Sequence, residues 1–199
     1  MKPALLLALL VTACSAENLF NGRSLDGWDG DPDLWRVENG ILIGDTGSKT
    51  IANNTFLVCR KTFANFHLIA EVRLRNGNSG IQFRSRHEPG AGWIVTGYQA
   101  DFSEDGDRSA WGNFYEEKGR GRGVMKTPDE GWRKGKLVYK QGDWNRVEII
   151  ARGPRMQLKL NGELTVDVTD EKASDGVIAL QLHRGPAMRV EFRKIEVRP

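Results

Sequence analysis

The sequence MQLKLNGELTVD, residues 156–167, carries the clearest local fold signal in the chain. Apolar and polar side chains alternate on both sides of the Asn161–Gly162 pair, and a period of two is typical of a strand with one buried face. Asparagine followed by glycine readily adopts the positive φ angles of a two-residue turn. Residues 155–160 and 163–167 are therefore predicted to form an antiparallel hairpin.

The same strand pattern extends along the chain in both directions. Short apolar runs are separated by glycine, asparagine and aspartate, and no stretch keeps a helical period. Further AsnGly pairs at 21–22, 39–40 and 76–77 predict the turns of tight hairpins. We expect an all-β fold, a two-sheet antiparallel β-sandwich, with strands at 35–37, 40–43, 55–59, 66–75, 80–85, 97–102, 144–152, 155–160, 163–167, 176–182 and 188–198.

One long segment, residues 103–136, departs from this pattern. It is rich in glycine and charge and shows no strand alternation. Loops of this length inside a compact domain are usually functional or mobile. We therefore expect a long loop here.

The first residues, MKPALLLALLVTA (1–13), predict a lipoprotein signal peptide. The apolar run is shorter than the roughly 20 residues that span a bilayer. Its end, VTAC, resembles the bacterial lipobox, so Cys14 is expected to be lipidated, with 14–18 as a tether and 19–199 as one folded domain. The expected location is the cell envelope, as a periplasmic or outer-membrane lipoprotein held by its acyl chains. An ordinary cleaved leader with an incidental cysteine is the alternative.

Composition and motifs narrow the function classes. The net charge is +3, but lysine and arginine are scattered, so a nucleic-acid partner is not expected, and the KGRGRG run at 118–123 is too brief to change this. No HxxxH, CxxC, GxSxG or GxxxxGK pattern occurs. No cofactor and no metal site is predicted from these spacings, although a divalent ion bound through carboxylate or carbonyl oxygens stays open.

Four strands pair an apolar face with a polar face of an unusual kind. Solvated strand faces favour lysine, glutamate, serine and threonine, whereas glutamine and arginine recur here at the strand centres. Such side chains suit a hydroxyl-rich ligand, and Trp93, Trp111 and Tyr115 are candidates to stack on sugar rings. A sugar-binding surface is predicted, with an ordinary solvated face as the alternative. Its members are Glu71, Arg73, Gln82, Arg84, Gln99, Asp101, Gln181 and His183.

Several motifs together resemble one known family. They are LFNGRSLDGW (19–28), GNSGIQFRSR (77–86), GYQADF (97–102), WGNFYEEKGRGR (111–122), DWNRVEIIARG (143–153), LNG (160–162) and IALQLHRGPAMRVEFRKIEVRP (178–199). In this order they are similar to the DUF1080 family, also called the 3-keto-disaccharide hydrolase domain, over nearly all of residues 19–199. The resemblance implies a concanavalin A-like jelly roll with its ligand on the concave face.

The resemblance also implies an enzyme that cleaves glycosides already oxidised to a ketone at carbon 3. Such a ketone acidifies the hydrogen on carbon 2, so a base can remove this hydrogen and the aglycone can leave from carbon 1. Water then adds back, and the net reaction is hydrolysis. Our hypothesis is that His183 or Glu71 is the base and that Asp101 or Glu116 assists the leaving group. Arg84 and Arg73 would stabilise the enolate.

The remaining expected contacts are to substrate. Gln99 and Gln181 would orient sugar hydroxyls, and the full expected substrate-binding set is Arg73, Gln82, Gln99, Trp111, Tyr115, Glu116 and Gln181. Two other functions stay open. One is a carbohydrate-binding, lectin-like module without turnover, since fold does not fix function. The other is an adhesion or scaffold domain that resembles laminin G modules and binds protein.

Overall fold

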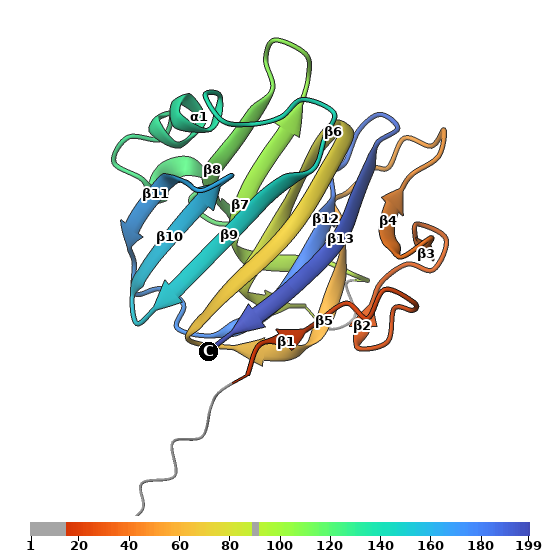
Figure 1. The fold of residues 1–199 in the computed structure, drawn as a ribbon, viewed down its shortest axis with the longest axis horizontal. Coiled ribbons are helices and arrows are strands. Elements are labelled where there is room, and N and C mark those ends of the chain that lie inside the picture. Colours follow the sequence, from red (N-terminus) through yellow and green to blue (C-terminus); the bar gives the residue numbers. More distant parts are fainter. Residues whose placement is uncertain (1–14, 89–91) are drawn as a thin grey trace, which may run out of the picture.

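The computed structural model describes residues 15–88 and 92–199, so the expected leader and Cys14 lie outside it (Figure 1). In the described part the chain folds into two packed antiparallel β layers, which confirms the predicted sandwich. Helical structure there is limited to the 3₁₀ turn η1 (Arg122–Val124) and the short helix α1 (Glu130–Gly135). Neither is long and apolar enough to cross a membrane.

The strands divide between two layers that share one long strand, β6 (Phe66–His87). Layer A contains, in hydrogen-bonded order, β11 (Glu163–Thr169), β10 (Arg155–Leu160), β9 (Asn145–Arg152), the first part of β6, β13 (Arg189–Arg198), β4 (Ile41–Asp45) and β3 (Trp35–Glu38), with β1 (Glu17–Asn18) also paired with β13. Layer B contains β8 (Ala110–Glu117), β7 (Val95–Glu104), the second part of β6, β12 (Gly176–Leu182), β5 (Thr55–Phe63) and β2 (Trp28–Asp29).

Strand β6 was predicted as two strands joined by a turn at Asn76–Gly77, and this prediction is wrong. The chain continues as one strand that pairs with β13 up to Asn76 and with β7 from Gly77 onward. Gly77 has a φ of 83°, and a Cβ there would lie 2.9 Å from the Cβ of Met188. The AsnGly pair therefore marks the crossing between layers and not a hairpin.

The predicted turns at Asn39–Gly40 and Asn161–Gly162 are confirmed. Both join paired neighbouring strands with positive φ at both positions. The Asn161 side chain also donates to Val138 O at 2.7 Å and accepts from Arg146 N at 2.9 Å, which ties this turn to layer A. The pair at 21–22 joins no two paired strands, so that hairpin prediction is wrong.

The segment 103–136 is not a simple loop as expected, because it contains all of β8 together with η1 and α1. Gly112 has a φ of 86°, and the pairing of β7 with β8 shifts register between Asp101 and Phe102. This irregularity turns Trp111 into the core and breaks the alternation that would have revealed the strand. Helix α1 then contacts both β8 and β11, near the edges of the two layers (Figure 1).

One buried cation connects three turns at an end of the sandwich. Arg84 has a φ of 47° inside β6, where the β6–β7 register shifts, and its side chain is turned away from the face it was predicted to share. Its guanidinium donates to Ala64 O at 2.7 and 2.9 Å, to Gly153 O at 2.7 Å and to Ala173 O at 3.4 Å. These acceptors lie in the β5–β6, β9–β10 and β11–β12 connections, so the role is structural.

We expect Arg84→Met to destabilise the fold by about 3 kcal/mol, because buried carbonyls would lose a charged donor. The measurement is urea unfolding followed by tryptophan fluorescence. The matched control is Arg86→Met, which removes an exposed contact to Asp175 and should cost less than about 1 kcal/mol. Equal losses for the two variants would contradict the structural role of Arg84.

Candidate functional site

Layer B carries a cavity of about 490 Å³ on the face turned away from the core. Alternation along β7 explains its polarity, because Tyr98, Ala100 and Phe102 point into the core and the residues between them point outward. The cavity is lined by Asn53, Asn54, Phe56, Asn78, Ile94, Gln99, Asp101, Tyr115, Glu117, Lys118, Arg122, Gln181, His183 and Arg184.

A row of buried amides forms the base of the cavity. Ser85 Oγ donates to Gln82 Oε1 at 2.7 Å, and Gln82 Nε2 donates to Gln99 Oε1 at 2.7 Å. This order leaves the Gln99 amide nitrogen to donate to Asp101 Oδ1 at 2.9 Å and to Gln181 Oε1 at 3.4 Å. The orientation of Gln99 is therefore fixed before any ligand binds.

Gly80 makes this cross-strand contact possible. The Gln99 side chain lies over it, and a Cβ at residue 80 would be 2.3 Å from the Gln99 amide carbon. Because Gly80 lacks a side chain, Gln99 on β7 reaches Gln181 on β12 across the intervening β6.

Asn54 links two other residues that line the cavity, Glu117 and Arg184. Glu117 accepts from Asn54 Nδ2 at 3.0 Å and from Gln181 Nε2 at 3.3 Å. The Asn54 oxygen in turn accepts from the Arg184 backbone N–H at 2.8 Å. The carboxylate of Glu117 is thus held by neutral amides, and within residues 15–88 and 92–199 it forms no ion pair.

Asp101 is the carboxyl group with the most unusual environment in the cavity. Burial raises the pKa of Asp101, and this outweighs the opposing effects of the Gln99 hydrogen bond and of the nearby Arg122 and His183. A raised pKa favours the protonated carboxyl, which can donate a proton to a ligand oxygen.

His183 lies just after the end of β12, at the edge of the same cavity. Its Nδ1 is 2.6 Å from the carbonyl oxygen of Arg184. A carbonyl can only accept, so this contact places the proton on Nδ1 and leaves Nε2 as the unprotonated nitrogen of the neutral ring. An imidazole in this tautomer can accept a proton at Nε2.

The structure brings together some of the predicted site residues and separates others. Gln99, Asp101, Tyr115, Gln181 and His183 line one cavity. The other six predicted residues lie outside its lining: Glu71, Arg73, Gln82, Arg84, Trp111 and Glu116.

Gln82 and Trp111 are buried. Gln82 supports Gln99 from behind, as the row of amides shows. Trp111 is 1 % exposed and stacks on Phe102 with ring centroids 4.6 Å apart, so it is a core residue and cannot stack on a ligand. Its predicted contact with substrate is corrected for this reason.

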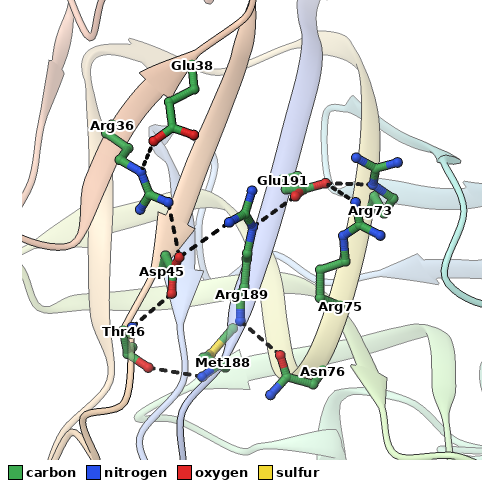
Figure 2. A network of polar contacts seen from close by, with 11 residues as sticks. Arg36, Glu38, Asp45, Thr46, Arg73, Arg75, Asn76, Met188, Arg189 and Glu191 are labelled. Carbon is green, nitrogen blue, oxygen red and sulfur yellow. Dashed lines mark hydrogen bonds and ion pairs between the residues drawn. The ribbon is translucent and has the colours of Figure 1, made fainter.

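Glu71 and Arg73 lie on the outward face of layer A, on the other layer from the cavity. Arg73 donates to the buried Glu191 at 2.6 Å within the network shown in Figure 2, and Glu71 pairs with Arg193. Arg73 and Arg193 each stack on the Trp144 ring at 4.5 Å. The expected common surface therefore does not include these two residues, because they precede the crossing at Asn76–Gly77 and still belong to layer A.

Glu116 is buried behind the cavity and forms ion pairs with Arg120 and Lys172. Burial would raise the pKa of Glu116, but its hydrogen bonds to these two cations outweigh burial and lower it. The Arg120 guanidinium also donates to Asp170 Oδ2 at 2.7 Å, and the hydroxyl of Tyr98 donates to the same carboxylate. An ionised carboxylate held in this way is poorly suited to protonate a leaving group, so the structure disfavours the role predicted for Glu116.

The cavity contains charged residues that the sequence did not assign to it. Lys118 and Arg122 come from the KGRGRG run, and Arg184 follows His183. The three basic residues of the run divide between two sides. Lys118 and Arg122 line the cavity, whereas Arg120 forms ion pairs with Glu116 and Asp170 behind it. The run was a visible signal, but the sequence could not show which residues faced inward. Asn53, Asn54 and Asn78 gave no distinctive signal.

Within residues 15–88 and 92–199 there is no group of three or more histidine, cysteine, aspartate or glutamate side chains arranged to hold a metal ion.

The fold and the cavity define a two-layer antiparallel β-sandwich with a polar cavity on the outer face of one layer. Similar solved structures include two proteins from Parabacteroides distasonis assigned as glycosyl hydrolases. The first has a TM-score of 0.65 at 20% identity, covering 93% of this chain and 94% of that one, and the second has 0.61 at 21% identity, covering 92% and 98%. The carbohydrate binding module CBM66 from Bacillus subtilis has 0.52 at 16% identity, covering 85% and 94%. These likenesses confirm the concanavalin A-like jelly roll.

No curated protein sequence matches the chain. Residues 15–198 match the model of the 3-keto-alpha-glucoside-1,2-lyase-like domain. The chain therefore belongs to this family, as its motifs predicted.

The electrostatics of the cavity can be tested by titration. We expect Asp101 to titrate above the usual range of aspartate, and Arg122→Gln to raise its pKa further because a nearby positive charge is removed. Carboxyl-carbon NMR of aspartate-labelled protein measures both. Arg133→Gln, on the neighbouring helix, removes the same charge from a residue outside the lining of the cavity, so its effect on the pKa of Asp101 should be smaller. An Asp101 that titrates at or below the usual range would show that burial does not dominate.

Proposed function

We propose that this protein cleaves 3-keto-glycosides by elimination and hydration in the cavity of layer B. The observation that carries the proposal is the convergence of Asp101, His183 and Arg122 on one cavity in a chain of the 3-keto-alpha-glucoside-1,2-lyase-like family. A candidate acid, a candidate base and a positive charge are the groups that this chemistry needs.

In the first step His183 is the base. Its Nε2 would remove the hydrogen from carbon 2, which the neighbouring ketone acidifies, and the electron pair would move onto the oxygen at carbon 3. Arg122 lies near enough to affect the pKa of Asp101, and it would stabilise this enolate oxygen. Arg122 thus replaces Arg73 and Arg84 in the role predicted from sequence.

In the second step Asp101 is the acid. The enolate electrons return to form the carbon 1–carbon 2 double bond, the bond from carbon 1 to the glycosidic oxygen breaks, and Asp101 donates its proton to the leaving oxygen. A raised pKa keeps the carboxyl protonated to higher pH and suits this task. Water then adds to carbon 1 and a proton returns to carbon 2, which gives the free 3-keto sugar.

The amides at the base of the cavity would bind the sugar. Gln99 and Gln181 are both buried and held by neighbours, so they present donors and acceptors at fixed positions to sugar hydroxyls. Tyr115 lines the cavity beside them and offers an aromatic surface to the ring.

We expect purified protein to release free sugar from 3-keto-trehalose, and His183→Ala and Asp101→Asn each to lower kcat about a hundredfold or more. Product release is followed by chromatography. The matched controls are Glu71→Gln and Arg73→Met on layer A, which should retain wild-type rates. Loss of activity in these controls, or full activity in both cavity variants, would contradict the assignment.

The roles of base and acid can be separated in heavy water. Removal of the carbon 2 hydrogen leads to deuterium exchange even when the leaving group does not depart. Asp101→Asn should therefore keep exchange while losing cleavage, whereas His183→Ala should lose both. In the wild type, kcat should fall as the pH rises through the pKa of Asp101, because the acid loses its proton, and Asp101→Asn should lack this fall.

A carbohydrate-binding module without turnover is the second candidate, and the likeness to CBM66 favours it. It predicts that 3-keto-trehalose binds without product, and that unoxidised trehalose binds as well as the ketone. Calorimetry with both sugars, beside the product assay, separates the two functions.

We also propose that the mature protein is a lipoprotein of the cell envelope, attached through Cys14. The support is the leader sequence that ends in VTAC. Labelled palmitate should be incorporated into the wild type expressed in a bacterium and not into Cys14→Ser. The variant should also be absent from the membrane fraction, where the wild type is expected. Labelling of Cys14→Ser would contradict the proposal.

A further inference from the structure

The cavity has more positive charge than the proposed reaction uses. Lys118, Arg122 and Arg184 line it together with two carboxyl groups. The raised pKa of Asp101 favours its neutral form, and Glu117 is occupied by the amides of Asn54 and Gln181. Arg122 is assigned to the enolate, which leaves Lys118 and Arg184.

These two cations line the rim of one cavity, from the β8–η1 and β12–β13 connections. Asn54 connects them, because its side chain accepts from the backbone of Arg184 and donates to Glu117, the neighbour of Lys118. Both side chains are exposed, whereas the sugar-binding Gln99 and Gln181 are buried at the base. Lys118 has one long ion pair, 3.6 Å to Glu88, and Arg184 has no carboxylate partner in the described ranges.

The loop that carries Lys118 is held in a defined shape. Lys118 has a φ of 52°, and a Cβ at Gly119 would lie 2.4 Å from the carboxyl group of Glu116. Glu116 is itself fixed by Arg120 and Lys172 from behind. A cation presented on such a loop has a more defined position than a solvated lysine on an open strand.

We propose that Lys118 and Arg184 recognise an anionic group on the aglycone, so that the preferred substrate is a 3-keto-glycoside of an acidic alcohol or phenol. This rests on the proposed function and names its substrate class. The sugar occupies the buried base, and the aglycone is the part that reaches the rim. An oxyanion such as a carboxylate is the group that a guanidinium and an ammonium bind best.

The test compares matched substrates. The 3-keto-α-glucoside of 4-hydroxybenzoate carries a carboxylate, and that of 4-hydroxybenzamide is a neutral analogue of similar size. We expect kcat/KM to be about tenfold higher for the carboxylate at low salt. The ratio should fall close to one in the Lys118→Gln/Arg184→Gln double variant and when salt screens the charges. The Arg23→Gln/Arg108→Gln double variant removes the same charge from outside the cavity and should keep the ratio.

A third substrate locates the anion. If a 3-keto-glucuronide of the benzamide phenol is preferred and the aglycone carboxylate has no effect, the cations read the sugar and the proposal is overturned. Equal kcat/KM for carboxylate and carboxamide also overturns it, while turnover of both leaves the proposed function standing. If no substrate turns over, the proposed function fails, and calorimetry with His183→Ala still measures whether the carboxylate glycoside binds more tightly than the carboxamide.

Discussion

The backbone hydrogen bonds of β6 change partners at Asn76 and Gly77, from β13 in layer A to β7 in layer B. Buried backbone groups must be paired, so this one strand fixes how the two layers lie against each other. It also decides which side chains meet. Glu71 and Arg73, before the crossing, face outward on layer A, whereas Gly80 and Gln82, after it, lie beneath the cavity of layer B. The arrangement of the amides depends on this crossing.

The amide row and the charged residues around it contribute in different ways. Gln82 and Gln99 are almost fully buried and satisfied by one another, so their positions are set by packing and hydrogen bonding within the sheet. Lys118 and Arg122 instead come from the connection after β8, which the ion pairs of Arg120 hold from behind. A rigid sheet thus provides the base of the cavity, and an anchored loop provides the charge at its rim.

Local pattern was sufficient where neighbours in sequence are neighbours in space. The hairpin at Asn161–Gly162 and the inward face of β7 followed directly from alternation and turn chemistry. Three features of the fold could not be predicted from local sequence pattern. The crossing within β6 uses the same AsnGly pair as a turn, Gly112 hides the alternation of β8, and the positive φ of Arg84 moves it to another face.

The same limit applied to the candidate site. Gln99, Asp101, Gln181 and His183 were predicted because they stand at alternating positions on strands or at a strand end, and they do line one cavity. Glu71 was grouped with them because its strand shows the same alternation, yet only the long-range pairing of β6 tells which layer that part of the strand joins. Asn54 comes from a connection whose position depends on the whole fold.

The coordination of Arg84 has a consequence for how the protein responds to acid. One guanidinium holds the carbonyl oxygens of three separate connections, and neither partner gains or loses a proton between mildly acidic and mildly alkaline conditions. A junction built on carboxylate–cation pairs would be sensitive to pH, because protonation of a carboxylate removes its attraction to the cation. A junction without titrating groups lets Asp101 change its protonation state on the other side of the sheet while this end of the scaffold stays as it is.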